Sequence, residues 1–185
     1  MTLPRCSWVL LPLAGLLAST PADYQAVQRK FDSIQSGRLR PGVRVELTAA
    51  ELNAYAEHNL PAGVRDPRLQ ITGPGIATGS AVVDFNKLGQ ATGHPPGFLM
   101  SMLLGGEKPV RVTARIQSSG GEAIVDLQSV QVSGLEVSGP ALDFLIRNVL
   151  LPLFPDAVVG RPFELGRHIS ALDVQPRAVG VVIGR

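Results

Sequence analysis

The stretch VRVTARIQSSGGEAIVDLQSVQV, residues 110–132, contains two runs in which apolar and polar side chains alternate. A polar segment that contains two glycines, residues 118–121, separates the two runs. Alternation with a period of two is typical of strands that bury one face, and a short polar connection between such runs is typical of a hairpin. The stretch therefore predicts two neighbouring antiparallel strands.

Similar alternating runs lie on both sides of this hairpin. They cover residues 43–47, 68–71 and 77–85 before it, and 172–174 and 179–183 after it, around a turn at 175–177. Because the connections are short and polar, we expect an antiparallel sheet. The glycines of residues 73–79 look superficially like a phosphate-binding loop, but a strand and not a helix follows them, which favours a hairpin turn.

Helical spacing of apolar residues occurs near both ends of the chain. Residues 23–36 are predicted to form an amphipathic helix. Its apolar positions are Tyr24, Val27, Phe31 and Ile34. A second helix is expected after Gly139, over about 140–153, and it is apolar except for a narrow edge, so it should be buried nearly all round or clasped by a curved sheet. The predicted fold class is α+β, with a curved antiparallel sheet wrapped around one or two helices.

A third helix is predicted directly after the strand at 43–47. Thr48 and Glu51 fit a capping box, in which each side chain accepts a hydrogen bond from the other residue's backbone N–H. The helix should run from Ala49 to about Asn59. Its expected buried residues are Leu52, Tyr55 and Ala56.

The first residues have the layout of a secretory signal peptide. Arg5 precedes an apolar run over 8–18, and small residues follow as far as Ala22. We expect a leader at 1–22 and a single α+β domain at 23–185 that works outside the cytoplasm, in the periplasm or secreted. A membrane span needs about twenty apolar residues, so this run is short for an anchor, but a leader that stays uncleaved remains an alternative.

Charge and cysteine content exclude several classes of function. The formal net charge is +2, which gives no electrostatic reason to expect nucleic acid. Cys6 is the one cysteine and lies in the expected leader, so the domain should contain no disulfide and no thiolate ligand. Two basic groups are interpreted either as solvated strand faces or as contacts for a lipid phosphate. They are Arg111 with Arg115, and Arg161 with Arg167.

The chain shows no catalytic or metal-binding signature. Its histidines are His58, His94 and His168, and none has a metal-ligand spacing such as H-E-x-x-H. The G-x-S-x-G elbow of serine hydrolases does not occur. We therefore predict no catalytic residue, metal or cofactor, and keep a hydrolase with a dispersed site as the third hypothesis.

Nineteen consecutive residues, 88–106, contain no Asp, Glu, Lys or Arg. Large apolar side chains gather within segment 96–106. One interpretation is a short helix that closes one end of the core. The other is a lid over an apolar cavity, or a surface that touches lipid or membrane, and the adaptable methionines of the segment suit variable partners.

Two sequence pieces carry a resemblance to a known family. They are ELTAAELNA at 46–54 and VQVSGLEVSG at 130–139, within an order of elements that extends from Val43 to Ile183. In these features the chain resembles the LmeA-like family of envelope lipid-binding proteins, which are similar to the tubular lipid-binding (TULIP) superfamily. The resemblance implies a long helix wrapped by a strongly curved antiparallel sheet, with an apolar groove between them for phospholipid or another acyl lipid.

The first hypothesis is an extracytoplasmic, non-catalytic protein that holds an acyl lipid between a helix and the curved sheet. Its expected ligand-binding residues are Phe98, Leu99, Met102 and Leu103 from the uncharged segment, and Phe144, Ile146 and Leu150 from the late helix. The alternative is a structural or adaptor domain of the cell envelope that docks a protein partner of unknown identity through segment 96–106.

Overall fold

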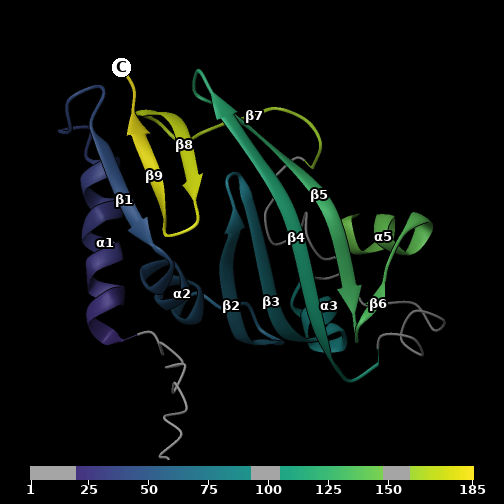
Figure 1. Cartoon of the computed structure of the whole chain (residues 1–185). Coiled ribbons are helices and arrows are strands. Elements are labelled where there is room, and N and C mark those ends of the chain that lie inside the picture. The colour runs from purple at the N-terminus through teal and green to yellow at the C-terminus, as the bar shows by residue number, and fades with distance from the viewer. Residues whose placement is uncertain (1–19, 93–104, 148–158) are drawn as a thin grey trace, which may run out of the picture.

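The structure is a computed structural model that describes residues 20–92, 105–147 and 159–185. Its elements are α1 (Pro21–Gln35), β1 (Arg44–Thr48), α2 (Ala49–His58), β2 (Val64–Gly73), β3 (Ile76–Asp84), α3 (Phe85–Thr92), β4 (Glu107–Ser119), β5 (Glu122–Val132), β6 (Leu135–Glu136), α5 (Gly139–Leu145), β7 (Phe163–Glu164), β8 (Ile169–Gln175) and β9 (Ala178–Ile183). Helices accompany a large, curved antiparallel sheet (Figure 1), so the predicted α+β class is confirmed.

The described strands form two sheets. The larger has the order β2-β3-β4-β5-β6, and β7 also pairs with β5. The smaller has the order β1-β9-β8, so that strands from the two ends of the chain lie side by side. In Figure 1, α1 lies beside the small sheet, whereas α3 and α5 lie at the far end of the large sheet. None of the helices in the described ranges is long and apolar enough to cross a membrane.

The hairpin predicted from residues 110–132 is confirmed as β4 and β5. Its apolar residues pair across the two strands as Val110–Val132, Val112–Val130, Ala114–Leu127 and Ile116–Val125. Paired residues point to the same face of a sheet. One face of the hairpin is therefore apolar from Val110 to Ile116 on β4 and from Val125 to Val132 on β5.

A β-bulge keeps the apolar face of β5 continuous. Leu127 and Val130 are three residues apart, a spacing that would place them on opposite faces of a regular strand. Leu127 pairs with Ala114, while Ser129 pairs with Thr113, so Gln128 is an extra residue in β5. The extra residue reverses the alternation and returns both halves of the strand to one face.

The turn at 73–75 joins the two sheets. It is a hairpin turn, as predicted, because Gly73 pairs with Ile76. Gly75 N donates to Val174 O of the small sheet at 2.9 Å, and Ile116 N donates to Gly75 O at 2.7 Å. Gly75 has φ +68°, and a Cβ atom there would lie 3.0 Å from Ile116 O. This close approach and the left-handed backbone explain why glycine occupies the position.

Helix α1 begins with a capping box of its own. The Thr20 side chain accepts from Asp23 N, and the Asp23 carboxylate accepts from Thr20 N at 2.8 Å. The Asp23 carboxylate also accepts from the Thr20 hydroxyl at 2.7 Å, and the bonds from this hydroxyl and from Thr20 N hold the pKa of Asp23 below its ordinary value. Thr20 thus belongs to the first turn of α1, two residues before the point where cleavage of the leader was expected. The rest of that leader, residues 1–19, lies outside the described residues.

The amphipathic face of α1 packs on α2 and the small sheet. Val27 is fully buried and Ile34 nearly so, in a core cluster that they share with Leu47, Val181 and Ile183. The rings of Tyr24 and His58 stack at 3.7 Å. The stripe of apolar residues predicted for residues 23–36 is therefore confirmed.

Helix α2 confirms its capping box but not its expected buried face. Glu51 N donates to Thr48 Oγ1 at 3.2 Å, and Thr48 N donates to Glu51 Oε2 at 2.8 Å. The buried residues are Glu51 and Ala54, whereas Tyr55, which was expected inside, is 39% exposed. The Tyr55 and Phe31 rings meet edge to face, with their centroids 4.8 Å apart, so the tyrosine packs at the exposed edge of the contact between α1 and α2.

The far end of the large sheet carries α3 and α5. Phe85, predicted to end a strand, instead begins α3, because the Asp84 carboxylate accepts hydrogen bonds from the backbone N–H groups of Asn86 and Lys87. The bond from Lys87 N is the main reason why the pKa of Asp84 is lowered. Phe85 and Leu88 pack with Leu145 of α5 and with sheet residues in a second core cluster. The part of the late helix predicted over 148–153 lies outside the described residues.

Candidate functional site

The large sheet has one predominantly apolar face, here called the inner face. Its centre, on β3, carries only small residues: Ala77, Gly79 and Ala81. These pair with Ala114, Val112 and Val110 of β4, respectively. Small residues in the middle of a sheet leave space that large ones would fill, so the inner face is hollowed along β3.

Helix α2 is fixed to the edge of the large sheet by one side chain. Asn53 Nδ2 donates to Leu69 O at 3.0 Å, and Leu69 N donates to Asn53 Oδ1 at 2.7 Å. The amide therefore pairs with edge strand β2 as a neighbouring strand would. These bonds satisfy backbone groups that would otherwise stay open at the edge of the sheet, and they hold α2 beside the inner face.

A hollow of about 360 Å³ lies between α2 and the inner face, and we call it the α2 groove. Its apolar lining residues are Ala56, Pro67, Leu69, Gly79, Ala81, Val83, Val110 and Val112. Arg68 and Ser80 also border it. A Cβ atom built on Gly79 would meet nothing within 4 Å, which independently locates open space above that residue. The volume is within the usual range for small-molecule sites.

The charges at the mouth of the α2 groove are held by neighbours. Arg68 Nη1 lies 3.2 Å from Glu57 Oε1, which turns the guanidinium towards α2. Arg65 lies outside the groove, because it pairs with Val82 on the opposite face of the sheet, and its Nη2 atom lies 2.7 Å from Glu107 Oε2. The hydrogen bond from Arg65 holds the pKa of Glu107 below its ordinary value. At the α2 groove itself, the charge of Arg68 thus lies at the rim, while apolar side chains line the interior.

A second apolar hollow of about 650 Å³, here called the α1 groove, lies between α1, the small sheet and residues 165–169. Phe31 and Ile34 of α1 line one side, and Leu172, Val179 and Val181 line another. Leu52 of α2 lines the α1 groove, whereas Ala56 lines the α2 groove. One helix therefore contributes to both hollows.

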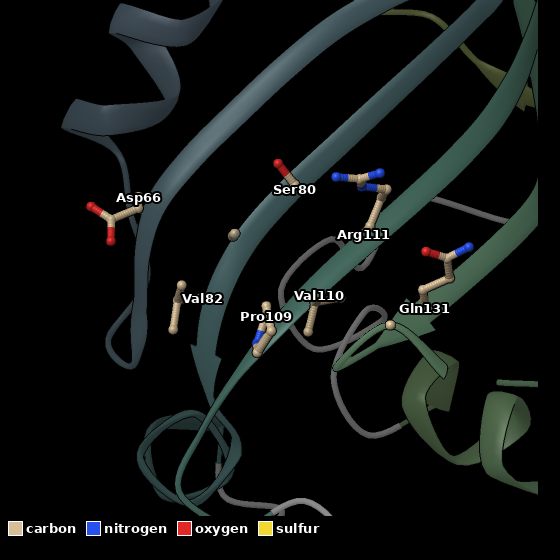
Figure 2. A pocket seen from close by; sticks show the side chains of 9 residues that line it. Asp66, Ser80, Val82, Pro109, Val110, Arg111 and Gln131 are labelled. Carbon is tan, nitrogen blue, oxygen red and sulfur yellow. The ribbon is translucent and has the colours of Figure 1, made fainter. Parts of the chain in front are cut away.

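The outer face of the large sheet carries a hollow of about 370 Å³ whose lining is part polar and part apolar. Figure 2 shows Asp66, Ser80, Arg111 and Gln131 around it, on β2, β3, β4 and β5. Asp66 has φ 52° and pairs with Arg65, where β2 bulges. Arg111, a candidate for lipid phosphate in the sequence, therefore faces away from the α2 groove.

Most ligand-binding residues predicted from the sequence are not placed by the structure. Phe98, Leu99, Met102, Leu103 and Leu150 lie outside the described residues, as does the side chain of Phe144. Ile146 is described and half-buried, directly after α5. The described grooves are instead built mainly from strand and helix residues that the sequence indicated only as core. The run of small residues over 77–81 was the available signal for the α2 groove.

The histidines form no metal centre in the described parts of the chain. No group of three or more His, Cys, Asp or Glu side chains that could hold a metal ion occurs there. His58 stacks on Tyr24, and its Nδ1 atom lies 3.2 Å from Ala54 O. His168 borders the α1 groove, and His94 lies outside the described residues.

Comparison with known proteins gives no relative from which a function could be transferred. No protein-family model, no curated protein and no solved structure matches the chain. A function must therefore be argued from the grooves and their lining.

Proposed function

We propose that this protein is a non-catalytic, extracytoplasmic lipid-binding protein that holds an acyl chain in the α2 groove. The observation that carries the proposal is the open apolar space above Gly79, between a helix and a curved sheet. The resemblance to LmeA-like envelope proteins likewise implies an apolar groove between a helix and a curved sheet, although with a long helix and not with the ten-residue α2. The signal-peptide layout of residues 1–22 supports the compartment.

The physical basis of binding is removal of hydrocarbon from water. Burying one methylene contributes about 0.8 kcal/mol, so about ten methylenes contribute on the order of 8 kcal/mol before losses. Association and ordering of the chain offset part of this energy. A binding site that works in this way needs an apolar wall and sufficient length, and it needs few polar contacts. The lining of the α2 groove has that chemistry.

The test fills the groove from its floor with Gly79→Leu. The new side chain would project into open space, and replacing a strand glycine should not weaken the sheet. Displacing two methylenes of the ligand removes about 1.6 kcal/mol of binding energy, which is more than a tenfold loss of affinity. Affinity would be measured by titration with a phosphatidylglycerol that carries a fluorescent acyl chain.

Gln70→Leu is the matched control. Gln70 is exposed on β2, and its partner across the strands is Thr78, next to Gly79 on the opposite face of the sheet. The same leucine is thus added one strand away, outside the groove, and lipid affinity should stay unchanged. Equal affinities of wild type and a folded Gly79→Leu variant would refute binding in the α2 groove.

A further inference from the structure

The α1 groove combines an apolar interior with a basic rim. Its volume of about 650 Å³ exceeds that of the α2 groove. Leu47, Leu52, Leu165 and Ile169 extend the apolar wall made by α1 and the small sheet. The polar side chains that border it are Gln35, Arg167 and His168. Apolar and basic groups are therefore separated within one hollow, as the two ends of an amphiphile are.

One residue of the basic rim, His168, is held in place by its backbone. His168 has φ 68°, and its carbonyl accepts from Gly184 N at 2.8 Å, which ties the residue to the end of β9. The His168 ring lies against Gly37, because a Cβ atom built there would be 2.9 Å from His168 Nε2. The imidazole is thus positioned just beyond the C-terminal end of α1, beside the groove.

Neither basic side chain is neutralised by a neighbour in the part of the chain that the structure describes. The ion pairs there include no partner for Arg167 or His168. Asp173, on the same strand as Leu172, pairs with Arg44 instead. An anion at the rim would therefore find an available guanidinium, and a charged hydrogen bond of this kind is stronger than a neutral one.

We propose that the α1 groove binds a single-chain amphiphile with an anionic head group. The alkyl tail would lie against Ile34, Leu172 and Val179, and the head group would accept hydrogen bonds from Arg167, beside His168. This site is separate from the α2 groove, and the proposal does not depend on lipid binding there. The shared chemistry of the ligand class is an alkyl chain that ends in a carboxylate or a phosphate.

The test compares dodecanoate, dodecyl phosphate and the neutral dodecanol as probes, each below its micelle concentration. Binding would be followed by NMR of ¹³C-labelled valine and leucine methyl groups, including those of Val179 and Leu172. Both anions should shift these signals and bind about tenfold more tightly than dodecanol, since one charged hydrogen bond is worth about that factor. A difference between the two anions identifies which head group the rim prefers. Equal affinity of all three probes would overturn the proposal.

Two variants assign the effect to this hollow. Arg167→Gln is an exposed change that should remove the preference for the anions and leave dodecanol affinity unchanged. Val179→Phe should fill the interior and weaken all three probes. Gly79→Leu should leave dodecanoate binding here intact, so a failure of the α2 groove and a failure of this site are distinguishable. Unchanged anion preference in Arg167→Gln would refute the site even if Val179→Phe did not fold.

Discussion

The substitution Lys30→Met tests how α1, which lines the α1 groove, and α2, which contributes to both grooves, are held together. Lys30 Nζ lies 2.6 and 2.7 Å from the two carboxylate oxygens of Glu51, and it also donates to Glu46 O at 2.6 Å. Glu51 is only 6% exposed. Burial by itself raises the pKa of Glu51, but the bonds from Lys30 and Thr48 N outweigh it and leave that pKa below its ordinary value. The Glu51 carboxylate is therefore a buried charge that depends on Lys30.

Removing one partner of a buried ion pair typically destabilises a protein by about 3–5 kcal/mol. The Lys30 side chain is 33% exposed, so water can approach the carboxylate after the substitution. We therefore expect a loss of about 3 kcal/mol, at the lower end of that range. The free energy of unfolding would be obtained from urea titration followed by far-UV circular dichroism, with equal slopes as the check that stability alone has changed.

The loss of unfolding free energy in Lys30→Met should depend on pH. Because the pKa of Glu51 is lowered in the folded protein, this group adds stability above the ordinary pKa of about 4.3, and the gain is lost as pH falls through the lower, folded value. In Lys30→Met the ammonium no longer offsets the effect of burial on the pKa of Glu51. Protonation of Glu51 then removes a buried charge and increases the stability of the variant. The difference between variant and wild type should therefore begin to shrink above the ordinary pKa of Glu51, where the variant takes up a proton, and should go on shrinking as pH falls through the lowered pKa of the wild type.

The double variant Lys30→Met/Glu51→Gln is the control. Glutamine can keep the capping box with Thr48 while removing the buried charge, so most of the lost stability should return. A loss below about 1 kcal/mol in Lys30→Met, typical of a surface pair, would refute this account. So would a double variant that is no more stable than the single one.

Two further substitutions test the frame of the grooves. Asn53→Ala removes both side-chain bonds to Leu69 and should lower the free energy of unfolding by about 1–3 kcal/mol, measured by urea titration; an unchanged midpoint would contradict the edge-pairing role. Gly75→Ala should lower the free energy of unfolding by about 1–2 kcal/mol because alanine disfavours the left-handed backbone, and the close contact of its Cβ atom with Ile116 O adds to this loss. Gly73→Ala should be tolerated, since its Cβ would have no neighbour closer than 3.8 Å, and equal thermal midpoints for the two alanine variants would be inconsistent with strain at Gly75.

Local signals in the sequence predicted local structure well. The capping box of Thr48 and Glu51, the alternating runs around residues 118–121 and the helical stripe of α1 all appear in the structure. Each depends on residues a few positions apart, whose geometry the backbone fixes directly. The boundary at Asp84 was missed although aspartate is a preferred N-cap, because the alternation of β3 continues into Phe85.

Long-range structure was not readable from the same signals. No local pattern indicates that β1 pairs with β9, or that Lys30 meets Glu51 twenty-one positions away. For the same reason the predicted buried face of α2 was wrong at Tyr55, since the position of α1 decides which side is covered. The α2 groove arises where small residues on β3 lie beside α2, a juxtaposition that only the folded chain reveals.

Native mass spectrometry of the gently purified full chain tests the central claim of lipid binding most directly. The account predicts a species heavier than the chain by one acyl lipid, which organic extraction removes and which is depleted in Gly79→Leu but present in Gln70→Leu. The account would be contradicted if the wild-type protein carried no lipid and its organic extract contained no more lipid than that of Gly79→Leu.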